Sequence, residues 1–160
     1  MLPRAPFVRM NPNFWDVSWE VEAITARYPV AMQISVTQVA LACCAMEVST
    51  AMALDLPAQV DDLHIRAADG EPADLNVLVI AGTITAGSLE RLETAWAQLP
   101  EPRAAIAYGV CASSGGPYWD SYAVVESSIT ASRFVPGCPP PRSTLVDAIA
   151  AVSREQVSLA

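Results

Sequence analysis

The run of residues 75–81 constrains the fold more than any other part of the chain. It reads LNVLVIA and ends at Gly82, so apolar residues, several of them β-branched, fall on both of its faces. A strand of this kind must be covered on both sides, as the inner strands of parallel sheets are. We therefore predict a buried strand here, within an α/β fold.

A helix and a second strand are predicted directly after this run. Ser88 stands as a helix cap before apolar residues at helical spacing (Leu89, Leu92, Trp96 and Leu99), and Pro100 ends the pattern. Residues 104–108 then form an apolar stretch that also ends at a glycine, Gly109. The order strand, helix, strand is typical of a parallel βαβ unit.

The rest of the chain extends this pattern. Residues 30–54 predict a strand and then a helix, and residues 55–74 predict an acidic connection with a short strand at 63–66. Residues 120–128 predict a short helix or strand, and Ser143 a cap for a final helix. We therefore predict an open, mostly parallel flavodoxin-like sheet with helices on both faces.

The first 27 residues differ from the remainder. They combine prolines with aromatic residues and predict an N-terminal arm that docks on partner subunits, so that residues 28–160 form a single α/β domain. The chain has nine basic and 17 acidic residues, for a net charge of −8, which excludes a nucleic-acid-binding surface. Because only 16 % of residues are charged, we expect partner chains to cover much of the surface.

Neither a secretory signal nor a membrane span is predicted. Before Asn11 the chain has no apolar core of the kind that signal peptides contain. No charged residue occurs between Arg27 and Glu47, but Pro29 and Gln33 interrupt this stretch. We expect it to be buried or to face an interface.

The chain has four cysteines, Cys43, Cys44, Cys111 and Cys138. Neighbouring Cα atoms stand about 3.8 Å apart, less than the roughly 4.4 Å that a disulfide needs, so Cys43 and Cys44 should not bridge each other. The Cys-x₂₋₄-Cys knuckles of structural zinc sites are missing. Four unrelated buried cysteines remain an alternative to a shared site.

Glycine and proline surround the later two cysteines, in the stretches 109–116 (GVCASSGG) and 136–140 (PGCPP). Such loops let the backbone approach a thiolate and point N–H groups at its sulfur, and four thiolates satisfy a 4Fe–4S cluster. Cys111 directly follows a predicted strand, at the sheet edge where α/β proteins bind ligands. Cys138 lies on a later loop that can reach this edge, and the Cys43–Cys44 pair would complete the site.

Five stretches occur together in a recognisable order: 41–47 (LACCAME), 73–75 with 80–85 (ADL and IAGTIT), 99–103 (LPEPR), 109–116 and 135–140 (VPGCPP). Over about residues 41–150 the sequence thereby resembles the 20 kDa iron–sulfur subunit of the proton-pumping NADH–quinone oxidoreductase (respiratory complex I), a family related to the small subunits of nickel–iron hydrogenases. The adjacent cysteine pair favours the complex I branch.

The resemblance implies an electron-transfer subunit of such an oxidoreductase. Its one 4Fe–4S cluster would be held by Cys43, Cys44, Cys111 and Cys138, and would pass electrons toward quinone at the interface with a larger catalytic subunit. Other iron–sulfur and membrane subunits would complete the complex. The implied location is peripheral to the membrane, on the cytoplasmic side in a bacterium or the matrix side in a mitochondrion.

Two segments depart from the family pattern. Residues 67–72 bring in acidic residues where a second basic residue is usual, and residues 126–135 belong to a shortened loop without the usual hydrophobic stretch. Two alternatives therefore stay open. One is the small subunit of an energy-converting membrane hydrogenase or of another quinone-independent reductase, and the other is a divergent paralogue with a structural role.

A few further side chains have two interpretations each. Arg66 and Arg103 are candidates to compensate the charge of a buried anionic cluster, while Arg103 equally fits the solvated start of a strand. Glu47, three residues after Cys44, would either respond to the cluster's redox state or pair with a partner subunit. His64 is interpreted as a surface position on a strand.

Overall fold

Five strands form one parallel sheet in the computed structural model, which describes residues 32–54 and 63–159. The predicted arm at residues 1–27 lies outside the described residues. The strands are β1 (Met32–Ala40), β2 (Leu63–Ala67), β3 (Leu75–Ala81), β4 (Arg103–Tyr108) and β5 (Arg133–Val135). The helices are α2 (Cys44–Leu54), α3 (Ala86–Gln98), the short α4 (Val110–Ser114), the single 3₁₀ turn η2 (Gly116–Tyr118) and α5 (Ser143–Leu159).

The strand order is β2-β1-β3-β4-β5, and each neighbouring pair is parallel. This is the flavodoxin-like order, in which the chain changes direction across the sheet between β1 and β3. The predicted open, mostly parallel sheet is therefore confirmed. Parallel pairing also brings the carboxyl ends of all these strands to one edge, and the loops that follow β1, β4 and β5 meet there.

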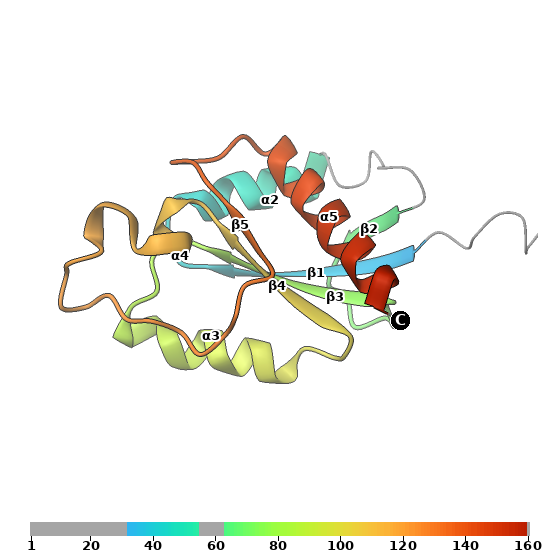
Figure 1. Cartoon of the computed structure of the whole chain (residues 1–160), viewed down its shortest axis with the longest axis horizontal. Helices are drawn as coiled ribbons and strands as arrows, with labels where there is room; N and C mark the ends of the chain where they lie inside the picture. Colours follow the sequence, from blue (N-terminus) through green and yellow to red (C-terminus); the bar gives the residue numbers. More distant parts are fainter. Residues whose placement is uncertain (1–31, 55–62, 160) are drawn as a thin grey trace, which may run out of the picture. The chain divides into compact units, whose positions relative to one another are not determined.

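Helices cover both faces of this sheet, as Figure 1 shows: α2 and α5 lie on one face and α3 on the other. Every residue of β3 is buried, as its sequence predicts. Val77 and Val79 belong to the core beneath α2 and α5, whereas Leu78 and Ile80 belong to the core beneath α3. The alternation of side chains along a strand thus supplies both cores from one segment.

Two predicted details differ from the structure. Helix α3 begins at Ala86, before Ser88, and the Ser88 hydroxyl accepts a hydrogen bond from the Thr85 N–H at 3.0 Å. Ser88 is thus the third residue of a capping box rather than the cap itself. Residues 120–128 form neither helix nor strand, because one antiparallel bridge, between Thr85 and Val124, is all the regular pairing they make. Among the described helices, none has the length and apolar character needed to cross a membrane.

Candidate functional site

The topology places all four cysteines at the carboxyl edge of the sheet. Cys43 and Cys44 lie where β1 gives way to α2, Cys111 lies in α4 just after β4, and Cys138 follows β5. Cys44 is 1 % exposed and Cys111 7 %, while Cys43 and Cys138 are exposed. None of the four forms a disulfide. The structure therefore brings together the residues that the sequence pattern grouped.

Backbone hydrogen bonds hold these loops against one another. The N–H groups of Leu41 and Ala42 both donate to the carbonyl of Ala81, at 2.9 and 3.2 Å, which fixes the segment before the cysteine pair to the end of β3. The Val110 N–H donates to the Gly137 carbonyl at 2.9 Å, which joins the Cys111 loop to the Cys138 loop. The sulfurs thus come from segments with fixed relative positions.

The thiol of Cys44 senses the other three cysteines. Its pKa is raised from 9.0 to about 11, chiefly by burial and then by the charge and hydrogen bond of Cys43 and the charges of Cys111 and Cys138. Ionising one thiol here disfavours ionising the next. Four thiolates can share this edge only when a cationic centre binds them, which fits an iron-based ligand.

Two glycines make room for sulfur. A Cβ atom added at Gly109 would lie 2.6 Å from the Cys44 Sγ, and one at Gly116 would lie 2.8 Å from the Cys111 Sγ. The N–H groups of Gly109 and Val110 are bonded to the carbonyls of Val135 and Gly137, so the expectation that they point at sulfur is wrong for these two. These glycines therefore contribute by leaving the sulfur atoms room that a side chain would occupy.

The donor set fits a 4Fe–4S cluster: four thiols, from three loops of one sheet edge. Within the described residues, no three His, Cys, Asp or Glu side chains gather closely enough to hold one metal ion. A 4Fe–4S cluster takes one thiolate on each iron, so its ligands stand farther apart than those around a single zinc ion.

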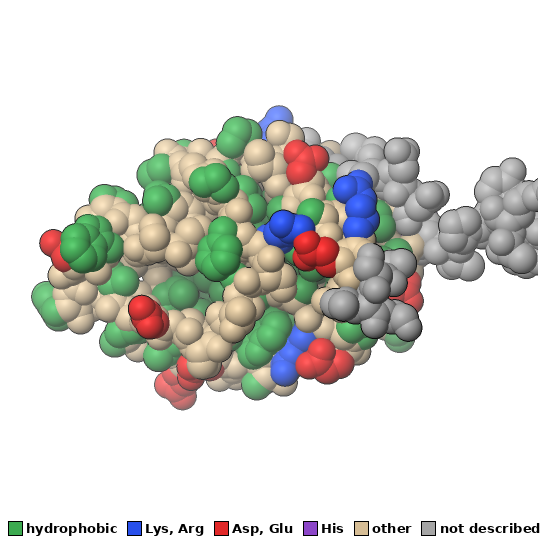
Figure 2. All heavy atoms as spheres, in the orientation of Figure 1, with side chains coloured by type: hydrophobic (Ala, Val, Ile, Leu, Met, Phe, Trp, Pro, Cys, Tyr) green, Lys and Arg blue, Asp and Glu red, His purple; other side chains and the backbone are tan. Residues whose placement is uncertain are grey.

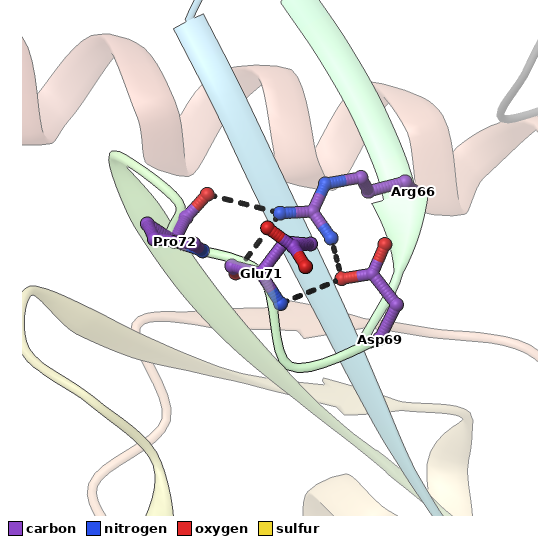
Figure 3. Close-up of polar contacts among 4 residues, drawn as sticks. All are labelled: Arg66, Asp69, Glu71 and Pro72. Atoms are coloured by element: carbon purple, nitrogen blue, oxygen red, sulfur yellow. Dashed lines mark hydrogen bonds and ion pairs between the residues drawn. The ribbon is translucent and has the colours of Figure 1, made fainter.

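Arg66 is not aimed at this site. Its guanidinium pairs with the Asp69 carboxylate and donates to the carbonyls of Glu71 and Pro72, both at 3.0 Å (Figure 3). In the sheet Arg66 lies opposite Ser35, well before the end of β1 at Ala40. Its expected role as a counter-charge to the cluster is therefore wrong, because its guanidinium is bound by Asp69 and by the carbonyls of Glu71 and Pro72.

Arg103 is the first residue of β4 and so lies at the opposite end of that strand from Cys111. Its Nε pairs with the Glu101 carboxylate at 2.7 Å, and its guanidinium lies 4.5 Å from the centre of the Trp96 ring. The alternative interpretation, the start of a strand, is confirmed. Arg91 is a cation that no sequence pattern indicated: it reaches from α3 to the carbonyl of Ala40, at the cysteine edge.

Glu47 and Tyr108 lie close to the cysteine pair. Tyr108, the last residue of β4, is fully buried, and burial raises its pKa; a hydrogen bond from Thr144 lowers it, while Glu47 and Cys44 raise it. No role was expected for Tyr108 from the sequence, although it stands directly before the glycine that precedes Cys111. His64 is exposed on β2, as expected.

A cavity of about 620 Å³ opens beside Cys111 on the α3 side of the sheet. Residues 124–127 and 129–131 form part of its wall, together with Ile80, Ile84, Trp119 and Phe134. Part of segment 126–135, which the sequence comparison with the family singled out as an expected departure, therefore borders the candidate site.

Exposed apolar side chains surround the same edge. Met46 is 74 % exposed and Trp119 71 %, and Tyr118 and Tyr122 are also exposed. In the view of Figure 2 the left end, where α4 lies, shows apolar and acidic side chains, and the basic ones stand further right. Such an edge has the character of a surface that another protein covers.

Thiol labelling tests this geometry in the cluster-free full-length chain. With iodoacetamide at pH 7 we expect the exposed Cys43 and Cys138 to react first, and Cys44 and Cys111 slowly, as read by tandem mass spectrometry. Because the thiolate is the nucleophile, the raised pKa predicts that the Cys44 rate still climbs about ten-fold per pH unit past pH 9. Equal rates for Cys43 and Cys44 at pH 7 would contradict the structure.

The raised pKa of Cys44 also makes the stability of the cluster-free chain depend on pH. The native state holds the Cys44 proton more tightly than the unfolded chain does, so the stabilisation is present below pH 9 and is lost as the pH rises toward 11.

The chain is similar to known respiratory proteins over most of its length. The family model described as NADH ubiquinone oxidoreductase, 20 kDa subunit, matches residues 38–152. A subunit of the NADH-quinone oxidoreductase of Rubrobacter xylanophilus is 37 % identical over 125 residues, 74 % of this chain and 47 % of that protein. The same subunit of Pelodictyon phaeoclathratiforme is 34 % identical over 127 residues, 74 % of this chain and 66 % of that protein. The chain spans about half to two thirds of the length of these relatives.

Among solved structures, a chain of the membrane-bound sulfane sulfur reductase, an archaeal respiratory membrane complex, superposes with a TM-score of 0.61. The match covers 82 % of this chain and 73 % of that one, at 22 % sequence identity. At this identity the likeness shows the shared α/β fold.

Proposed function

The chain belongs to the family of the 20 kDa subunit of NADH ubiquinone oxidoreductase, and from this membership we propose that it is an electron-transfer subunit with one 4Fe–4S cluster. Cys43, Cys44, Cys111 and Cys138 would each bind one iron. The observation that carries the proposal is the meeting of these four thiols at one edge of the sheet, where the other three raise the pKa of Cys44.

The chain's own residues hold, space and shield the ligands. The backbone bonds from Leu41 and Val110 set the positions of the loops, and Gly109 leaves room for the Cys44 sulfur. Burial of Cys44 and Cys111 keeps water from half of the ligand set. When bound, the cluster supplies one-electron storage at a potential that its hydrogen bonds and solvent exposure adjust.

The partners belong to the same proposal. In a complex I-type assembly, NADH would give up two electrons and one proton to become NAD⁺. Quinone would take up two electrons and two protons to become quinol, with the second proton drawn from solvent. The exposed apolar edge around Met46 and Trp119 supports contact with a larger catalytic subunit that covers the site. A peripheral position in a membrane complex, on the cytoplasmic or matrix side, follows from that assembly.

Iron and sulfide analysis tests the cluster directly. The full chain, purified with its native complex, should contain about four irons and four acid-labile sulfides per copy. Reduction with dithionite should produce an electron paramagnetic resonance signal of a 4Fe–4S cluster. Absence of iron, sulfide and signal together would overturn the proposal.

The adjacent subunit decides between electron acceptors. The local engagement of Arg66 and the acidic residues in segment 67–72 keep a quinone-independent reductase as the second candidate. Nickel bound to cysteines of the neighbouring large subunit would favour that candidate. A quinone-binding cavity without such cysteines would favour the first.

A further inference from the structure

The hydroxyl of Tyr108 lies behind the loop that carries Cys138. It donates a hydrogen bond to the carbonyl of Pro140 at 3.1 Å or of Pro141 at 3.2 Å. Tyr108 itself is fully buried beneath α2 and α5, so its hydroxyl forms a hydrogen bond with the protein rather than with water. The phenol thereby connects the end of β4 to the chain that leads into α5.

The loop depends on donors from elsewhere. Proline occupies positions 136, 139, 140 and 141, and a proline has no N–H group to donate. The Pro141 carbonyl accepts bonds from the nearby Thr144, through both its N–H and its hydroxyl, and from Tyr108. The Pro140 carbonyl accepts from the distant Tyr108. Pro140 is itself buried, and a buried carbonyl without a donor is unfavourable.

The other side of the loop is held from the same short segment. The Gly109 N–H donates to the Val135 carbonyl at 2.8 Å, and the Val110 N–H donates to the Gly137 carbonyl. Cys138 thus lies between two anchors, one before it and one after it, and both come from the three residues that begin with Tyr108. That segment also continues into Cys111.

We propose that Tyr108 is a positioning residue whose buried hydroxyl fixes the Cys138 loop relative to Cys44 and Cys111. Removing this one oxygen leaves the Pro140 carbonyl without its donor, while the front anchor and the bonds from Thr144 to Pro141 stay in place, so the Cys138 thiolate changes position without loss of the fold. This inference rests on the proposed function, because Tyr108 controls two properties of the cluster: its midpoint potential and the rate at which the chain loses it.

The test compares Tyr108→Phe with Tyr122→Phe in the cluster-loaded full chain. Both variants lose one phenolic oxygen, but Tyr122 is fully exposed and lies outside the cysteine loops. We expect Tyr108→Phe to shift the midpoint potential in a redox titration followed by electron paramagnetic resonance, and to lose its cluster to a chelator about ten-fold faster, a typical outer-shell effect. Tyr122→Phe should match the wild type in both.

A wild-type potential, spectrum and loss rate in Tyr108→Phe would overturn the inference. Should that variant fail to fold, 3-fluorotyrosine at position 108 keeps the ring and the hydroxyl while strengthening the O–H as a donor, and it must also shift the potential; an unchanged potential is then contrary to the inference. A wild-type chain without any cluster would instead overturn the proposed function, so the two failures are distinguishable.

Discussion

Replacing Cys111 with serine is expected to abolish cluster binding while the protein fold persists. Serine has nearly the shape of cysteine, but its hydroxyl does not ionise near neutral pH and so does not replace a thiolate on iron. Loss of a direct ligand should exceed the roughly 10- to 100-fold weakening that outer-shell changes cause. Iron content and the resonance signal of the purified full chain measure it.

Ser114→Ala is the matched control. Ser114 is in the same short helix α4, it is exposed, and its hydroxyl bonds only back to the carbonyl of Val110 among the described contacts. This variant should retain a full cluster. If Cys111→Ser instead keeps both its iron and the electron transfer of the assembled complex, the chain acts as a structural paralogue and the ligand assignment is wrong.

Gly109→Ala is expected to lose the cluster and to destabilise the chain as well. Gly109 has φ of +92°, and the new methyl group would lie 2.6 Å from the Cys44 sulfur. The backbone conformation alone costs an alanine about 1–3 kcal/mol. The steric conflict adds to this, because Cys44 is buried at the start of α2 and its sulfur has little room to move.

Two other glycines separate these contributions. Gly70 has a similar φ of +87° but nothing within 4 Å of an added Cβ, so Gly70→Ala measures backbone strain alone. Gly87 lies in α3 with open space around it, and Gly87→Ala should stabilise the protein by up to about 1 kcal/mol.

Urea unfolding of the cluster-free chains ranks the variants. From highest to lowest unfolding free energy, the expected order is Gly87→Ala, wild type, Gly70→Ala and Gly109→Ala. Only Gly109→Ala should fail to bind a cluster. A Gly109→Ala chain that is as stable as Gly70→Ala and holds its cluster would show that Cys44 does not lie where the structure places it.

Local pattern was sufficient to predict much of the sheet. The run at 75–81 has no polar face, so it had to be an inner strand, and the strand before Gly109 and the helix after residue 143 follow from spacing in the same way. The short helix or strand predicted at residues 120–128 was wrong, because this segment carries no strong periodicity and its regular pairing is one bridge to Thr85, far away along the chain.

The ion-pair and hydrogen-bond partners of charged side chains were less predictable. Arg66 is a candidate counter-charge by its sequence, but Asp69 and the carbonyls of Glu71 and Pro72 lie within a few residues and take up its guanidinium. Arg103 is the other candidate, yet it begins β4 while the cysteine loop follows the end of that strand, so the two lie at opposite edges of the sheet. A long, flexible side chain binds whatever acceptors the fold places near it, and a sequence pattern does not show which these are.

By itself, the amino-acid sequence determined which segments become strands and helices, and it supplied four thiols in loops rich in glycine and proline, because these properties depend on neighbours along the chain. Only the tertiary structure decided that the four thiols meet, that Gly109 makes space for a sulfur, and that the Tyr108 hydroxyl reaches the Cys138 loop. Each of these contacts joins residues that are far apart in sequence, and parallel strand pairing, which brings all the carboxyl ends to one edge, is what places them together.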